Sequence, residues 1–356
     1  MLQCVRPYMT SLYAYIIRRL ILLVFVIVGV TALIFAITML FPPEIRALLY
    51  IRNIQQYTPA NLRTVIRQYG LNDPFYLQYG RWMSQVLQGN LGWSVSSGQT
   101  VIDAIRTRWP YTFEIVVFAA PLIVFIGIYI GVQAAIHRNG IIDHAARVVS
   151  IVGWSLPSFW LGLLLLAIFY GMLGWFPPGA LSQSAIAFKL QSGFVEYTGI
   201  DLLDGLLNGP GAFWITLDAI KHAVLPVIVI VTIDIALLIR VMRSSMLETL
   251  SKQYIVTAKA KGLSKKVVLY KHARRNALIP VATLSGLLVA GLLGGLIITE
   301  TVFGFGGLGQ WSARAAIQID MAAVLGYSML SAFMFVTANL IVDVLYAYID
   351  PRIRLE

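Results

Sequence analysis

Six long apolar segments constrain this chain more than any other feature of its sequence. They cover residues 20–41, 115–136, 148–173, 223–239, 277–299 and 321–342; five contain no charged residue, and the fourth contains Asp234. A helix needs about 20 apolar residues to cross a hydrocarbon core about 30 Å thick. Only 12% of all residues are charged, against about one quarter in soluble domains. The sequence therefore predicts an all-α, polytopic membrane protein with six transmembrane helices.

Positive charge is concentrated on alternate connections between these segments. One set carries Arg6, Arg18 and Arg19 before the first segment, Arg138 and Arg147 in the second connection, ten Lys or Arg in residues 240–279, and Arg352 and Arg354 in the tail. The opposite short connections carry only Lys189, Lys221 and Arg314. Because short loops rich in Lys and Arg stay in the cytoplasm, we expect both termini to be cytoplasmic.

The segments divide the chain into a simple order of parts. Residues 1–19 form a cytoplasmic arm, 20–41 the first transmembrane helix, and 42–111 a large extracytoplasmic loop expected to fold as short helices and turns. Residues 112–349 hold the other five helices, including the basic loop 240–279, and residues 350–356 form a cytoplasmic tail. Residues 20–41 lack a small-residue cleavage site after them, which favours a retained helix over a cleaved signal peptide.

The basic loop, residues 240–279, contains ten Lys or Arg and a single acid, Glu248. Leu247, Leu250, Tyr254 and Ala258 follow helical spacing and are expected to share one face of a helix. Gly262 then predicts a helix C-terminus, and Ser264 is a suitable N-cap for a second helix. In that helix Leu263, Val267 and Tyr270 are expected to share a face. The loop is therefore predicted to form two amphipathic basic helices joined at Gly262.

Motifs throughout the chain resemble one family of membrane proteins. They are Tyr15-Ile16-Ile17-Arg18-Arg19-Leu20, Gly70-Leu71-Asn72-Asp73-Pro74-Phe75, Gly89-Asn90-Leu91-Gly92-Trp93-Ser94, Leu156-Pro157-Ser158-Phe159-Trp160, Leu173-Gly174-Trp175-Phe176-Pro177, residues 254–262, residues 271–280, Glu300-Thr301-Val302-Phe303-Gly304, Gly307-Leu308-Gly309, and Asp343 with Tyr346 and residues 350–354. In this order they resemble ABC importer permeases of the dipeptide, oligopeptide and nickel branch. Val256-Thr257-Ala258 stands where the broader importer signature has Glu-Ala-Ala.

The resemblance implies a permease subunit of a prokaryotic plasma membrane importer that moves short peptides, oligosaccharides or nickel by alternating access. It implies a second homologous permease, two ATP-binding subunits that hold ATP and Mg, and an extracytoplasmic solute-binding protein as partners. The basic loop would contain a cytoplasmic coupling helix that docks on an ATPase subunit. The residues that the resemblance assigns to coupling are Val256, Thr257, Ala258, Lys261, Gly262, Val267, Tyr270, His272, Asn276 and Pro280. Ala258 is expected to let the partner surface approach closely.

Asp234 is the one charged residue within the apolar segments. A charged acid there costs about 2.5–3.5 kcal/mol on insertion scales, so it should face the bundle interior or water. Two interpretations stay open: a pathway residue that contacts a substrate amine or a proton, or a structural partner of a polar neighbour such as Arg240. A proton-coupled secondary transporter using Asp234 is the alternative function, and a receptor or scaffold without transport is a third. Glu114 and Asp343 are expected at the membrane interfaces.

Other site chemistry is disfavoured. The single cysteine, Cys4, excludes an intrachain disulfide, and the four histidines include no close pair with a third ligand, so no metal site is expected. Residues 304–309 satisfy G-x-G-x-x-G, but they follow an apolar segment instead of a strand, which favours a tight turn over a dinucleotide site. No Gly precedes a Lys, so the chain has no Walker A loop and is expected to be a translocation subunit, not an enzyme. The basic charge is expected to contact membrane lipid and a protein partner, not nucleic acid.

Overall fold

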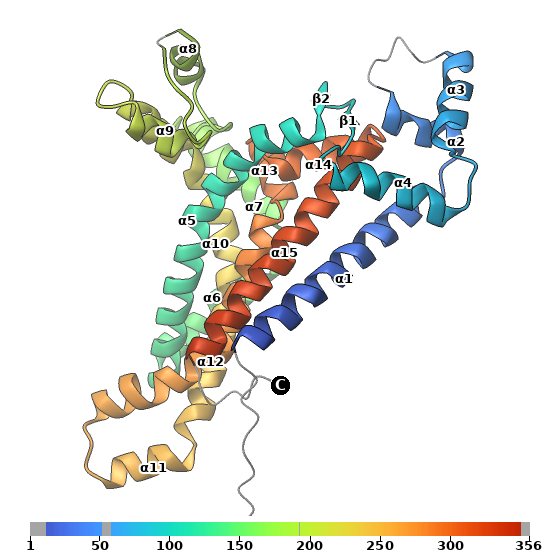
Figure 1. The fold of residues 1–356 in the computed structure, drawn as a ribbon. Helices are drawn as coiled ribbons and strands as arrows, with labels where there is room; N and C mark the ends of the chain where they lie inside the picture. Colours follow the sequence, from blue (N-terminus) through green and yellow to red (C-terminus); the bar gives the residue numbers. More distant parts are fainter. Residues whose placement is uncertain (1–11, 52–57, 192, 350–356) are drawn as a thin grey trace, which may run out of the picture.

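The computed structural model describes residues 12–51, 58–191 and 193–349 and is a bundle of long helices with smaller elements at both ends (Figure 1). Five described helices are long and apolar enough to cross a membrane. They are α1 (Leu12–Thr38), α5 (Val101–Ile136), α10 (Phe213–Leu250), α12 (Arg274–Leu293) with the π-helical segment Val267–Ala273 before it, and α15 (Met321–Ile349). The expected all-α architecture is confirmed, with one two-stranded exception.

The third predicted span is broken. α6 (Ile141–Ser155) is followed by α7 (Ser158–Leu165) and the π-helical segment Leu166–Met172, and the two parts are bent by 98°. Pro157 precedes α7 in an extended conformation and cannot donate a helical hydrogen bond, so the chain turns there. The span predicted over 148–173 is therefore a bent pair of helices, and the count of six spans holds if this pair is one span.

α10 is the centre of the bundle and packs against α5, α6 and α12. Glycines allow the closest of these contacts: a Cβ added to Gly127 would lie 2.7 Å from Leu238, and one added to Gly131 would lie 2.6 Å from Met242. The missing side chains let the backbones of α5 and α10 approach, as small residues commonly do in membranes. The main hydrophobic core therefore lies along α5, α10 and α12.

The loop predicted over 42–111 is built from short elements beside the end of α15 that begins at Met321, and this end of the bundle is called the outer end below (Figure 1). They are α2 (Pro43–Arg46), a 3₁₀ turn (Ala47–Tyr50), α3 (Pro59–Tyr69), α4 (Phe75–Leu87) and the antiparallel strands β1 (Trp93–Ser94) and β2 (Gln99–Thr100). Asp320 anchors the hairpin, accepting hydrogen bonds from Ser94 Oγ at 2.7 Å and from Ser96 N at 2.9 Å. The expected short helices and turns are confirmed, although α5 starts at Val101 and shortens the loop.

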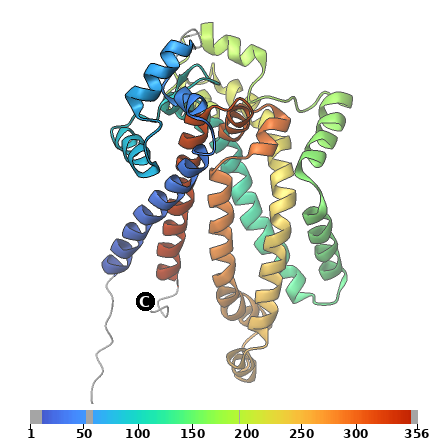
Figure 2. The same ribbon diagram turned by 90° about the vertical axis from the view of Figure 1, so that its right-hand side faces the viewer.

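Further elements complete the two ends of the bundle. α8 (Gln183–Gln191) and α9 (Asp201–Leu207) project from the outer end, where α13 (Ile297–Phe303) and α14 (Leu308–Ile317) also lie, and α11 (Gln253–Ala260) lies at the opposite end (Figure 1). α1 begins and α15 ends near the α11 end. Figure 2 shows α1 and α15 side by side, in agreement with their packing contacts.

Candidate functional site

The basic loop folds as a hairpin at one end of the bundle. α10 continues through the predicted start of the loop to Leu250, and Lys252 is extended with φ −71° and ψ 147° before α11 begins. The prediction that Leu247, Leu250, Tyr254 and Ala258 share one helical face was therefore wrong, because the chain turns between Leu250 and Gln253. Lys252 Nζ lies 2.7 Å from Glu248 Oε1 across this turn.

One face of α11 packs inward on the hairpin. Ile255 is fully buried, and both it and Ala258 belong to the main core cluster together with Met246, Val268 and Ala273. Ala258 is 7% exposed, so its small side chain accommodates this chain's own core and does not form the outer surface expected of it. α11 is thus fixed to α10 and to the segment that enters α12.

The other face of α11 is open. Val256, Thr257, Lys259 and Lys261 are exposed, with Val256 55% exposed and Tyr254 42% exposed. Gly262 follows with φ +74° and no atom within 4 Å of an added Cβ. The predicted break at Gly262 is confirmed, and its cause is a left-handed backbone that L-residues with a side chain adopt at a cost.

The return segment is bound to the bundle. Tyr270 is half-buried, accepts a hydrogen bond from Gln133 Nε2 at 3.4 Å and carries the guanidinium of Arg274 over its ring at 5.3 Å. The Nδ2 of Asn276 donates to the carbonyl of His272 at 2.8 Å. Val267 and His272 are half-buried, and Pro280 is exposed within α12. The structure thus brings the expected coupling residues together in one hairpin and its return.

Asp234 lies half-buried in α10 and makes no hydrogen bond or ion pair with any residue that the structure describes. Arg240 is not the partner of Asp234, so that prediction was wrong. The Arg240 guanidinium lies 4.9 Å from the ring centroid of Trp154, and its Nε donates to the carbonyl of Ala236. The two side chains are six positions apart on one helix, which does not place them on the same face.

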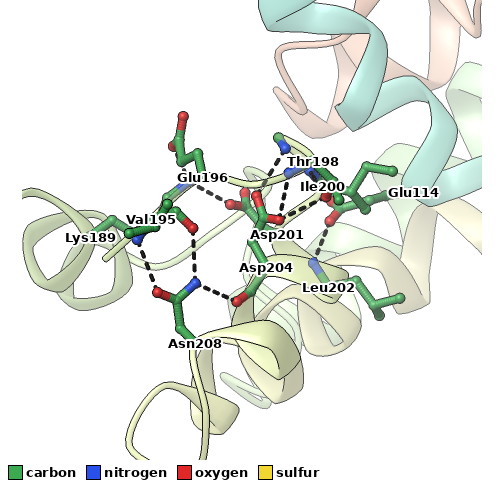
Figure 3. Close-up of polar contacts among 11 residues, drawn as sticks. Glu114, Lys189, Val195, Glu196, Thr198, Ile200, Asp201, Leu202, Asp204 and Asn208 are labelled. Carbon is green, nitrogen blue, oxygen red and sulfur yellow. Dashed lines mark hydrogen bonds and ion pairs between the residues drawn. The ribbon is translucent and has the colours of Figure 1, made fainter. Parts of the chain in front are cut away.

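At the outer end, a cavity of about 790 Å³ lies between the α8 region and the bundle. Its lining includes Tyr111, Lys189, Phe194, Glu196, Asp201 and Phe305. The Nζ of Lys189 lies 2.5 Å from Oδ1 of the fully buried Asp201 and 2.7 Å from Oε1 of Glu196 (Figure 3). Burial alone would lower the pKa of Lys189, but the hydrogen bonds to these two carboxylates outweigh it and raise the pKa.

Glu114 joins this outer cluster to the bundle. It is 2% exposed, and its Oε1 accepts a hydrogen bond from the backbone N–H of Leu202 at 2.8 Å, at the start of α9 (Figure 3). The α9 segment covers the side chain of Glu114, and its place at a membrane interface stays a prediction. Its carboxylate caps a helix that begins 87 residues later in the chain. The side chain of Asp343 lies outside the described residues.

Glu300 was missed from the sequence as a central residue of the outer end. It is fully buried, and its carboxylate accepts hydrogen bonds from Thr112 Oγ1 at 2.7 Å and from the backbone N–H of Gln310 at 2.9 Å. A Cβ on Gly307 would lie 2.6 Å from this carboxylate. The G-x-G-x-x-G motif thus contains a turn, as expected, and it packs against the Glu300 carboxylate. The sequence signal for this contact was a Glu four residues before a glycine-rich hexad.

Among the residues that the structure describes, no group of three or more His, Cys, Asp or Glu side chains is arranged to hold a metal ion. The described residues offer three features for function: an exposed face on α11, the carboxylate of Asp234 in α10, for which they provide no partner, and a charged cavity at the outer end.

Comparisons with known proteins agree with this architecture. The chain is 37% identical to the dipeptide transport system permease protein DppB of Alkalihalophilus pseudofirmus, over 96% of this chain and 99% of that protein. It is 38% identical to the di/tripeptide transport system permease protein DppB of Pseudomonas aeruginosa, over 96% and 98%. It is 36% identical to the oligopeptide transport system permease protein AppB of Bacillus subtilis, over 96% and 99%.

Two family descriptions match adjoining parts of the chain. Residues 123–355 match the binding-protein-dependent transport system inner membrane component, and residues 12–116 match the N-terminal part of such a membrane component. Neither description nor relative supports a proton-coupled carrier. The two matches together extend from α1 to the last residues of the chain, and on this basis the chain belongs to the family of inner membrane components of binding-protein-dependent transport systems.

Proposed function

We propose that this chain is the permease subunit that forms half of the translocation pathway of an ATP-driven importer of short peptides. The observation that carries the proposal is near full-length similarity to permeases named for dipeptide, di/tripeptide and oligopeptide transport. Oligosaccharides and nickel are the other substrates of the branch that the motifs resemble, and the uptake experiment below includes them.

The proposed partners are a second homologous permease, two ATP-binding subunits and an extracytoplasmic solute-binding protein. The sequence contains no Gly-Lys pair and hence no Walker A loop. ATP and Mg would therefore be bound by the ATP-binding subunits, and this chain would contribute translocation without catalysis.

The geometry of the hairpin supports a role for α11 in coupling. Its outer face offers Tyr254, Val256 and Thr257 to a partner, while Ile255 fixes its inner face in the same core cluster as Val268. A displacement of α11 would therefore be transmitted to α10 and α12 as movement of packed helices, since a dense core does not deform continuously. Such rigid-body movement is one of the recurring ways in which proteins switch between two states.

The proposed orientation places α11 and both chain termini in the cytoplasm of the prokaryotic cell. Ten Lys or Arg against one acid lie in residues 240–279, and α1 begins and α15 ends near the same end of the bundle (Figure 1). Short loops of this charge remain on the cytoplasmic side.

Two experiments test the proposal. A mild-detergent pull-down of the tagged chain should recover a second permease, ATPases with Walker motifs and a binding protein; recovery of the chain alone in several detergents would contradict the proposal. Uptake of labelled dipeptides, oligosaccharides and nickel in cells with and without the gene then identifies the substrate class.

A matched pair of glycine variants tests the coupling hairpin. Gly262→Val should abolish uptake at normal membrane abundance, because φ +74° is strained for a β-branched residue. Gly209→Val is the control: Gly209 also has positive φ (+84°) and open space around an added Cβ, but it lies before α10 at the other end of the bundle. Normal uptake by Gly262→Val would remove the hairpin from the coupling mechanism.

A further inference from the structure

Three arginines line a cavity that shares no lining residue with the outer cavity and lies outside the segment 253–280. The cavity measures about 270 Å³ and is lined by Arg147, Ser150 and Ile151 of α6 and by Arg240 and Arg243 of α10. Its lining comes from two helices that pack against each other, and Arg240 and Arg243 belong to the start of the basic loop 240–279.

Within the part of the chain that the structure describes, two of the three arginines pair with one carboxylate, that of Asp143, and Arg240 has no ion pair. Arg243 binds the fully buried Asp143 through two hydrogen bonds, Nε to Oδ1 at 2.5 Å and Nη2 to Oδ2 at 2.9 Å. The Nη2 of Arg147 lies 3.6 Å from the same carboxylate and 2.9 Å from His144 Nδ1, and its Nε is buried without a hydrogen-bond partner among the described residues. Three guanidinium groups therefore line the cavity against one carboxylate among the described residues, which leaves two positive charges that an anion would balance.

The terminal nitrogens of Arg240 are hydrogen-bond donors that also line this cavity. Its Nε donates to the carbonyl of Ala236, and its guanidinium lies over the ring of Trp154 at 4.9 Å. Within the described residues, neither of its terminal nitrogens has a hydrogen-bond partner. Terminal guanidinium nitrogens bind phosphate oxygens in paired geometry, which a lysine cannot reproduce.

The face of α6 beside the cavity is charged at Arg147 and apolar further along the helix. Arg147, Ile151 and Trp154 follow the spacing i, i+4, i+7 and lie on one face of α6, with Trp154 about 10 Å further along the helix axis than Arg147. Ile151 is 63% exposed and Trp154 is 53% exposed, and Val148 and Val152 are also exposed on α6. A charged pocket followed by an exposed apolar helix surface matches a phosphate headgroup followed by acyl chains.

We propose that this cavity binds the phosphate of an anionic glycerophospholipid, with Arg147 and Arg240 on the phosphate and the acyl chains along the outer face of α6. Basic pockets between membrane helices are a recognised type of anionic lipid site. The Asp143–Arg243 pair holds α6 against α10 and so fixes the spacing of the pocket. Such a lipid site requires that the chain is embedded in a membrane, and it would exist whichever substrate is transported.

The test is native mass spectrometry of the full chain, with the subunits that purify with it, reconstituted in phosphatidylcholine nanodiscs with and without phosphatidylglycerol. The wild type should retain one phosphatidylglycerol after delipidation. The double variant Arg147→Gln/Arg240→Gln should bind it roughly 30-fold more weakly, from about 1 kcal/mol per removed charge near the surface. The control Arg138→Gln/Arg275→Gln removes two exposed charges from the same end and should retain the lipid.

Equal retention by the two double variants would overturn the proposal. Displacement of the lipid by millimolar inorganic phosphate would identify a free-phosphate site instead, and a crosslink from position 151 to a second permease would identify a protein contact. If the double variant does not fold, Arg240→Gln alone serves, because the polar and ring contacts of the exposed Arg240 side chain with described residues are limited to the Trp154 ring and one carbonyl.

Discussion

The hydroxyl of Thr112 on α5 donates a hydrogen bond of 2.7 Å to Oε1 of Glu300 on α13, across 188 positions of the sequence. The same hydroxyl oxygen accepts a hydrogen bond from the backbone N–H of Leu308 at 2.9 Å, at the start of α14. One side chain thus connects a long membrane helix to both short helices at the outer end. This connection fixes the wall of the outer cavity that contains Phe305.

Thr112→Val should destabilise the protein by about 2 kcal/mol, because it leaves both the Glu300 carboxylate and the Leu308 N–H without this partner in a buried site. Thr112→Ser keeps the hydroxyl and should be close to wild type. Thermal unfolding of the two purified variants in the same detergent measures the difference. Equal midpoints for Val and Ser would show that the hydrogen bonds contribute nothing.

Glu300 should make stability depend on pH. Burial raises the pKa of Glu300 above its ordinary 4.5, although hydrogen bonds from Thr112 and from the backbone of Gln310, Leu296 and Gly309 oppose the rise. The folded protein therefore holds this proton more tightly than the unfolded chain does. Stability from this group is full below pH 4.5 and is lost as the pH rises through the raised pKa.

Glu300→Gln removes the titrating proton, so its unfolding midpoint should change less between pH 5 and pH 8 than that of the wild type, even if its absolute stability is lower. Melting curves across that range provide the measurement. A wild-type midpoint that increases with pH, and increases equally in the variant, would assign the dependence to other groups.

Lys189→Met should cost about 3 kcal/mol, because it leaves the carboxylate of Asp201 buried without its cation. Glu196→Gln is the matched control: its side chain contacts the same Lys189 but is 61% exposed, so its loss should have little effect. Adding Asp201→Asn to Lys189→Met should restore part of the stability. Limited proteolysis between α8 and α9, combined with thermal unfolding, distinguishes these outcomes.

Asp234→Asn should lower the uptake of peptides with a free amino terminus about tenfold while leaving membrane abundance and ATPase binding unchanged. The reason is that its carboxylate has no described partner, and a partnerless acid in a membrane helix is expected to face the pathway. Competition by free and N-acetylated dipeptides measures the specificity. If both peptides compete equally in wild type and variant, Asp234 has no role in recognising the amine.

The length and apolar character of six segments were enough to predict the membrane class, since a helix must satisfy its own backbone inside lipid. The turn at Gly262 was also predictable, because glycine adopts positive φ without a steric penalty. The motifs, taken in their order along the chain, were enough to indicate the family. The apolar segments and the turn depend on local chemistry, and the order of the motifs can be read along the chain without any contact between distant segments.

Packing between distant segments decided the features that the sequence did not predict. They are the bend at Pro157, the burial of Glu114 and Glu300, and the inward position of Ala258. Proline permits a break, but α7 also packs on α13, where a Cβ on Gly162 would lie 3.0 Å from Val302. Glu114 could not be recognised as buried without the α9 segment that covers it, nor the arginine cavity without α6 beside α10. The sequence by itself determined which segments enter the membrane and where the chain can turn. Only the tertiary structure decided which charged groups meet, because burial and pairing depend on neighbours that are remote along the chain.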